Sequence, residues 1–173
     1  IRDNMGDTLC RYEYDDLDQL IREDNAPLNK SFVYTYDKAG NITSRTTYPY
    51  SDGELTGIPS TVTYTYGNTS WGDQLTAYKG NSITYDAIGN PTQITTGEAS
   101  GYNLTWQGRR LLNYTGYGTE NGTSLSFTYN DEGIRTSKTV NGVTHTYMLS
   151  GTQVIGERWG TNVLLYLYDE NGS

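Results

Sequence analysis

The 173-residue sequence has little of what most globular folds are built from. Apolar residues make up 34% of it and charged residues 18%, against about 45–50% and about 25% in typical soluble domains. Alanine and methionine, which favour helices, are scarce. The single cysteine, Cys10, excludes an internal disulfide framework and a cysteine-based zinc site.

Long hydrophobic runs and clustered positive charge are also missing. No stretch of about 18 apolar residues occurs, so we expect no membrane span, and the first residues lack the apolar core of a signal peptide. The sequence begins at Ile1 rather than Met, and we expect a fragment of a larger protein. Twelve basic against 20 acidic residues give a net charge of −8, which argues against a nucleic-acid partner.

The residues that are abundant favour strands and turns. The sequence holds 26 threonines and 17 tyrosines, which suit pleated sheets, together with 20 glycines and 14 asparagines, which suit turns. This aromatic content also argues against disorder. The composition therefore predicts an all-β fold.

A short motif recurs eight times along the chain. Each copy has one position, here called the anchor, that ends a run of alternating residues and precedes a turn, and successive anchors lie 19 to 30 residues apart with a mean of 22. The seventh copy is weak, because its anchor is not aromatic. The anchors are Tyr14, Tyr36, Tyr66, Tyr85, Trp106, Tyr129, Met148 and Tyr168.

Each copy is predicted to be one β-hairpin. Alternation of aromatic or aliphatic residues with threonine before the anchor indicates a strand. An Asp or Asn after the anchor can accept a backbone N–H two residues on, and a glycine three residues later supplies positive φ, as in a type I turn closed by a bulge. The turn residues are Asp15, Asp37, Gly40, Asp86, Gly89, Asn130, Gly133 and Asp169.

Three departures from the repeat can be interpreted. Asp18 stands where glycine is expected and should tolerate the left-handed region. Leu17, Leu20 and Ile21 have a helical spacing, but the repeat register makes Leu20 the equivalent of Ile42 in a strand, so we reject a helix there. The copy anchored at Tyr66 has a longer turn.

The segment from Pro49 to Pro59 is the longest break in the pattern. We interpret it as an extended loop between strands, because the same repeat resumes on both sides, and a linker between two domains is the alternative. Residues 1–173 are therefore predicted to form a single domain of about eight hairpins, the first and last incomplete.

The repeat resembles the YD repeat of bacterial RHS (rearrangement hot spot) proteins. Tyr36-Asp37, Tyr85-Asp86 and Tyr168-Asp169 carry the Tyr-Asp pair, and residues 86–92, 104–111 and 129–135 also read like segments of that family. The family includes wall-associated proteins of Gram-positive bacteria, the shells of insecticidal toxin complexes, and the animal teneurins. The resemblance extends over essentially the whole chain.

The resemblance implies a fold and a role. Tandem hairpins would form one long, twisted, spiralling antiparallel sheet, part of a cocoon-like shell that encloses a C-terminal toxin in a secreted or cell-surface protein. The partners would be flanking repeats and the enclosed toxin, with possible end-to-end self-association of this fragment. The Asp-Pro motif with which some family shells release the toxin is missing here, so no self-cleaving residue carries over.

No group of residues predicts catalysis or a cofactor. His145 lies in an alternating strand and is interpreted as a surface residue, and Cys10, placed before the first strand, as an ordinary small residue. The acidic residues between positions 13 and 24 are interpreted as a solvated rim, with a Ca²⁺ site as the alternative, although the EF-hand spacing is not matched. We expect a protein that is not an enzyme.

The aromatic residues leave one further alternative open. Alternation places rings on one face of each strand, as in Phe32, Tyr34 and Tyr36, and threonines on the other, so ladders of stacked rings are expected between hairpins. Trp71, Trp106 and Trp159 could instead stack on sugars. The chain would then be a cell-surface module that binds carbohydrate or protein.

Overall fold

The protein is built almost entirely of antiparallel strands. A computed structural model describes Ile1 and residues 9–168, and in them the only helix is the three-residue 3₁₀ helix η1 (Gly118–Glu120). The chain divides into two compact units, Ile1–Gly80 and Asn81–Ser173, which are described separately. The predicted all-β class is confirmed.

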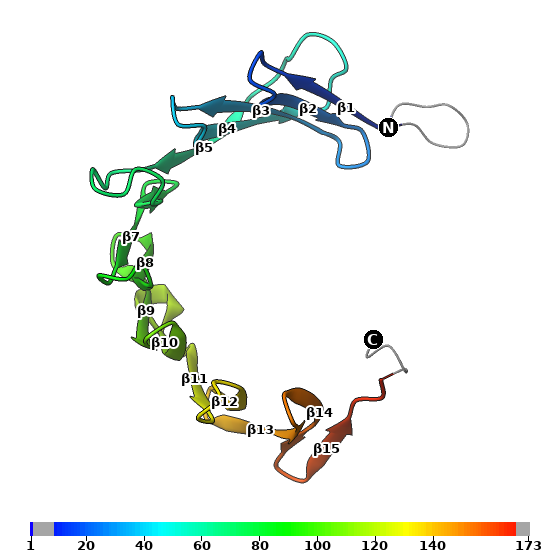
Figure 1. Ribbon diagram of the computed structural model, residues 1–173. Coiled ribbons are helices and arrows are strands. Elements are labelled where there is room, and N and C mark those ends of the chain that lie inside the picture. Colours follow the sequence, from blue (N-terminus) through cyan, green and yellow to red (C-terminus); the bar gives the residue numbers. More distant parts are fainter. Residues whose placement is uncertain (2–8, 169–173) are drawn as a thin grey trace. The chain divides into compact units, whose positions relative to one another are not determined.

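The first unit holds six strands (Figure 1). They are β1 (Cys10–Tyr14), β2 (Leu20–Asn25), β3 (Lys30–Tyr36), β4 (Ile42–Pro49), β5 (Ser60–Thr65) and β6 (Ala77–Tyr78).

The second unit holds nine strands. They are β7 (Asn81–Tyr85), β8 (Pro91–Gly97), β9 (Ser100–Gln107), β10 (Arg110–Tyr117), β11 (Ser124–Tyr129), β12 (Arg135–Val140), β13 (Val143–Ser150), β14 (Gln153–Trp159) and β15 (Asn162–Leu165).

The strands lie in sequence order, from β1 to β15. Within each unit the strands pair antiparallel with their chain neighbours, for example β3 with β4 from Lys30↔Pro49 to Tyr36↔Ile42. This is the topology of tandem hairpins, as predicted. The spiral, the cocoon and the single domain stay predictions.

One turn geometry closes several of the hairpins. Asp37 accepts the backbone N–H groups of Ala39 (2.8 Å) and Asn41 (2.9 Å) on Oδ1, and Gly40 has φ +88°. The strand register shifts by one residue between Thr35 and Tyr36, which is the expected bulge. The same turn recurs with Asp86 and Gly89 (φ +84°), with Asn130 and Gly133 (φ +85°), and with Asp15 and Asp18 (φ +59°).

The departures from the repeat fold as expected. Leu20 and Ile42 both begin return strands, so the helical spacing around Leu20 does not produce a helix. The turn after Tyr66 is long, and Asn68 orders it by accepting the backbone N–H groups of Ser70 (3.0 Å) and Trp71 (3.2 Å).

The segment between β4 and β5 is a loop inside the first unit. The strands on either side of it pair directly, from Ser44↔Thr63 to Thr47↔Ser60, so it does not separate two domains. The loop folds back onto β2 and β3. Arg22 donates to the carbonyls of Ser51 (2.9 Å) and Gly53 (2.8 Å), and the Ser31 hydroxyl donates to the Ser51 carbonyl (3.0 Å).

The apolar core is thin. Among the described residues, the buried hydrophobic side chains are Phe32 and Val62 in the first unit and Leu104 in the second. Buried polar residues are as prominent, including Asp24 and Ser31 under the loop after β4. A sheet without a second packed layer cannot bury both of its faces. Hydrogen bonds in the plane of the sheet must therefore hold the hairpins together.

The turn geometry gives a direct test. Replacing Gly89 by valine forces a β-branched residue to φ +84°, and we expect the free energy of unfolding to fall by more than about 1 kcal/mol. Gly72→Val is the matched control, because Gly72 has no positive φ and nothing lies within 4 Å of a Cβ there. Urea denaturation of both variants measures the difference. An unchanged midpoint for Gly89→Val would contradict the turn assignment.

Candidate functional site

A side-chain hydrogen bond joins each of several hairpins to the one before it. The hydroxyl of Tyr36 donates to the backbone carbonyl of Leu20 at 2.7 Å. Leu20 lies opposite Tyr14, the anchor of the previous copy, at the bulge that ends that hairpin. The anchor of one copy thus holds the turn region of the preceding copy. We call this contact the anchor clamp.

The anchor clamp recurs in both units. In the clamps seen here the donor comes later in the sequence, and the acceptor carbonyl belongs to the residue opposite the previous anchor or, for Val154, opposite the residue after that anchor. Other clamps run from Tyr66 to Ile42 (3.1 Å), from the Trp106 indole N–H to Pro91 (2.7 Å), from Tyr129 to Leu111 (2.9 Å) and from Tyr168 to Val154.

The clamp explains why the anchors are tyrosine or tryptophan. Both side chains combine a large apolar body with a hydrogen-bond donor at its far end, which phenylalanine lacks. Burial raises the pKa of the Tyr36 and Tyr66 hydroxyls above 10, so both keep the proton that they donate. Sequence reasoning missed this role, although the excess of 17 tyrosines over 2 phenylalanines was a signal for it.

Met148 is the anchor position without a donor, and an ionic cluster lies close to it. Glu157 in β14 accepts from the Tyr166 hydroxyl (3.0 Å), lies 3.4 Å from the Lys138 ammonium and contacts His145 Nδ1. Burial raises the pKa of Glu157, but these contacts outweigh it and hold the pKa below its usual value. The cluster ties β12, β13 and β14 to the segment after β15.

The two faces of the strands differ as predicted, but the aromatic face is not a continuous ladder. On the hydroxyl face, Thr35 lies 2.8 Å from the Thr43 hydroxyl and Thr128 lies 2.8 Å from that of Thr136. On the aromatic face, the ring contacts among described residues are Tyr64–Tyr78, Tyr102–Tyr114 and His145–Trp159. Arginines cover other rings, as Arg135 does over Phe127 at 4.3 Å.

The three tryptophans have different surroundings. Trp106 uses its indole N–H in a clamp, and Trp159 stacks on His145 with ring centroids 5.1 Å apart. Trp71 lies in the long turn after Tyr66 with 49% of its surface exposed. Of the three, Trp71 is the one whose ring is open enough to stack on a sugar.

The candidate catalytic and metal-binding groups have structural contacts. Glu13 pairs with Arg11 (2.7 Å) and Asp24 with Arg22 (2.9 Å). In the part of the chain that the structure describes, no group of three or more His, Cys, Asp or Glu side chains could hold a metal ion. Cys10 is the first residue of β1, so its expected position before the first strand is wrong. Asp169, predicted as a turn residue, lies outside the described residues.

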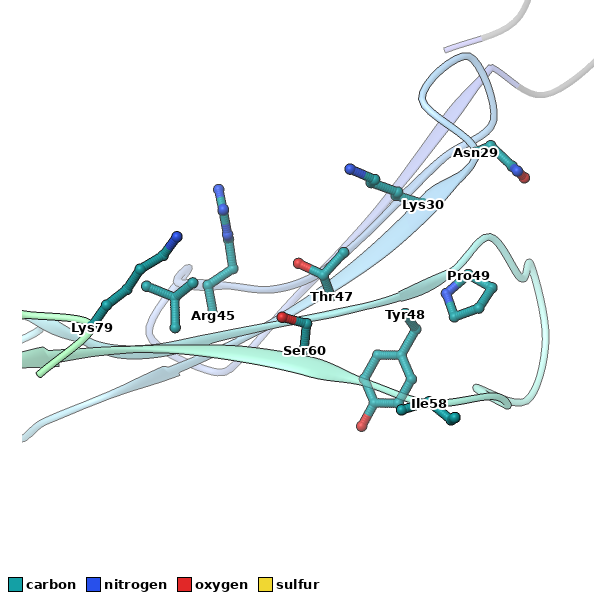
Figure 2. Close-up of a pocket in the computed structure, with 10 residues that line it drawn as sticks. Asn29, Lys30, Arg45, Thr47, Tyr48, Pro49, Ile58, Ser60 and Lys79 are labelled. Atoms are coloured by element: carbon teal, nitrogen blue, oxygen red, sulfur yellow. The ribbon is translucent and has the colours of Figure 1, made fainter. Parts of the chain in front are cut away.

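The first unit also has an open groove of about 550 Å³ over β3 to β5 (Figure 2). Three of its lining residues are cationic and none carries a carboxyl group. It is lined by Asn29, Lys30, Arg45, Thr47, Tyr48, Pro49, Ile58, Ser60, Val62 and Lys79.

One family model matches part of the chain. The family model described as RHS Repeat matches residues 14–55, which hold the turn after Tyr14, β2, and the hairpin of β3 and β4. No curated protein matches the sequence. Among solved structures, a chain of the Tc holotoxin pore of Photorhabdus luminescens, in a TccC3 mutant, is 15% identical with a TM-score of 0.36. The match covers 86% of this chain and 11% of that chain.

No helix in the described residues is long and apolar enough to cross a membrane.

The anchor clamp can be tested by removing one hydroxyl. Tyr129→Phe leaves the ring in place but removes the donor to the Leu111 carbonyl, and we expect a loss of about 1 kcal/mol in the free energy of unfolding. Tyr147→Phe is the control, because no hydrogen bond of the Tyr147 hydroxyl is seen within the described residues. Equal stability of the two variants in urea would show that the clamp contributes nothing.

The aspartate turns should make stability depend on acid pH. Hydrogen bonds from the side chain and backbone of Asn41 lower the pKa of Asp37 below 3.8. Burial raises the pKa of Asp86, but the bonds from Asn90 and Ile88 outweigh it, so that pKa is also lowered. A carboxyl group with a lowered pKa in the folded state stabilises the fold. This stabilisation is fully present above the pKa of the unfolded state and is lost as the pH falls through the pKa of the folded state.

The test compares urea midpoints at about pH 5 and about pH 2.5, on either side of the unfolded pKa. The double variant Asp37→Asn/Asp86→Asn keeps a side-chain oxygen that accepts the turn hydrogen bonds, as Asn130 does in its own turn. Because this oxygen does not titrate, the double variant should lose less stability in acid than the unmodified chain. Asp52→Asn serves as control, and its acid sensitivity should match that of the unmodified chain. A double variant as acid-sensitive as that chain would count against the carboxylate turns.

Proposed function

We propose that this chain, whose residues 14–55 match the RHS Repeat family model, is a non-catalytic wall segment of a larger protein shell. The shell would enclose a C-terminal toxin or effector polypeptide in a secreted or cell-surface bacterial protein. The observation that carries the proposal is the anchor clamp, which joins successive hairpins through a side chain as well as through the strand ladder.

A clamped sheet suits a wall better than it suits a conventional globular domain. A shell of hairpins must resist separation along its strands, and it must do so without a second layer behind every strand. The clamps and the hydroxyl pairs act within the sheet, where they serve that need. Repeats of this kind derive stability from each unit and from its contacts with its neighbours.

The terminal strands support the presence of further repeats on either side. In the described part of the chain the strand order ends in β1 and β15, each paired there with one neighbour. In β15 the apolar side chains Val163, Leu164 and Leu165 are 45–64% exposed. Exposed apolar strands with unpaired edges invite another strand. Flanking hairpins of the same protein would fill this place, and a second copy of the fragment could do so in isolation.

A structural role also fits the contacts of the groups that could do chemistry. His145 is held between Glu157 and the Trp159 ring, and Glu157 also contacts Lys138 and Tyr166. Glu13 and Asp24 pair with arginines, and Asp15 orders a turn. These contacts give each of the groups a role in holding strands or turns together.

The proposal is tested on the whole polypeptide that contains these repeats. Digestion with a nonspecific protease under native conditions, followed by mass spectrometry, should leave a C-terminal segment intact. That segment should become digestible after denaturation. A wall opened by removing two clamps, in Tyr36→Ala/Tyr129→Ala, should expose the segment without denaturant.

The control for that experiment is Tyr147→Phe, which removes a hydroxyl outside the clamps and should leave protection unchanged. Immediate digestion of every segment beyond the repeats in the unmodified protein would contradict enclosure. The repeats would then serve as a surface scaffold or as a cell-surface module that binds carbohydrate or protein.

A further inference from the structure

We propose that the groove over β3 to β5 binds an extended peptide segment in which acidic side chains flank apolar ones. The site goes beyond the wall function, because it depends on the side chains around one groove in the first unit and not on what a shell encloses.

The charge around the groove supports an anionic occupant. Lys30, Arg45 and Lys79 line it, and none of the three forms an ion pair with another described residue. The Arg45 Nε atom is buried and has no hydrogen-bond partner, while its guanidinium lies 5.4 Å from the centre of the Phe32 ring. In a protein of net charge −8, this groove is a local concentration of unpaired positive charge.

Glu23, a carboxylate on the neighbouring strand β2, has other contacts. Glu23 lies opposite Phe32 in the β2–β3 pair, and it accepts from the Asn25 amide (2.9 Å) and the Tyr34 hydroxyl (3.5 Å). It forms no ion pair with Lys30 or Arg45 among the described contacts. No carboxylate lines the groove itself, and one from outside would supply an ion-pair partner for its cations.

The spacing of the cations suits an extended peptide. Lys30 lies opposite Pro49 and Arg45 opposite Tyr34, so the two cations are separated by four residues along β4, or roughly 13 Å. Acidic residues four positions apart in an extended peptide have the same spacing. Lys79 donates its backbone N–H to the Thr63 carbonyl at 2.9 Å, which places it across β5 from Arg45.

Figure 2 shows Lys30, Arg45 and Lys79 on one side of the strands, with Thr47 between the first two. Arginine can hold a carboxylate through two parallel bonds, and lysine can pair with it as a point charge.

The apolar lining favours a peptide over a polysaccharide. Val62 lies opposite Arg45 in the β4–β5 pair and lines the groove with 7% of its surface exposed, whereas Tyr48 and Ile58 point to the other side of the strands (Figure 2). An aliphatic side chain of a peptide held by the cations would pack on Val62, whereas a sugar offers little apolar surface in return. Tyr48 is the one aromatic residue of the lining, and none of the three tryptophans is part of it.

The experiment is a fluorescence anisotropy titration of the chain with labelled synthetic peptides. The first peptide carries two glutamates four residues apart with a leucine midway and serines elsewhere. The second replaces both glutamates by glutamine, and polygalacturonate is the saccharide probe. We expect saturable binding of the acidic peptide, at least tenfold weaker binding of the glutamine peptide, and weakening by added salt.

Variants of the chain assign the binding to the groove. Lys30→Gln/Lys79→Gln should weaken binding of the acidic peptide tenfold or more, and Arg45→Gln should do the same with circular dichroism confirming its fold. Lys38→Gln removes a lysine in the turn after Asp37, away from the lining residues, and should leave binding unchanged.

Three results would overturn the proposal. The first is the absence of saturable binding of the acidic peptide. The second is undiminished binding of that peptide by the Lys30→Gln/Lys79→Gln variant. The third is saturable binding of polygalacturonate without binding of the acidic peptide. The last result would make the groove a site for an acidic saccharide.

Discussion

The register of the repeats depends on the hydrogen bond between an anchor side chain and a backbone carbonyl of the preceding hairpin. A shift of one residue in a strand moves every side chain to the opposite face, and a sheet with so thin an apolar core has little else to prevent it. When the Tyr129 hydroxyl reaches the Leu111 carbonyl, it fixes one hairpin against the next at a single position. The ladder bonds then form in only one alignment.

The hairpins and their turns could be predicted from the sequence because both are local. An Asp or Asn after the anchor and a glycine three residues later determine the turn without help from distant residues, as at Asp37 and Gly40. The clamp could not be predicted in this way, because its acceptor is a backbone carbonyl and every residue has one. Only the preference for tyrosine over phenylalanine pointed to a polar partner for the anchors.

Several side-chain contacts also could not be predicted from the sequence. Proline and glycine between positions 49 and 59 predicted a loop, but not that it would cover Asp24 and Ser31 and be held by Arg22. The aromatic face also differs from a ladder of stacked rings, because Arg45 and Arg135 lie over rings that neighbouring tyrosines were expected to cover. Such arrangements depend on side-chain reach across strands, which alternation in a sequence does not encode.

The clamps all point in the same direction, since every donor comes later in the chain than its acceptor. A ribosome releases a protein from its N-terminus, and domains fold as they emerge. Each new hairpin therefore meets an acceptor that already exists, on a hairpin that has already closed. The sheet can grow during synthesis one hairpin at a time, with the finished edge serving as the template for the next addition and no later segment needed to correct it.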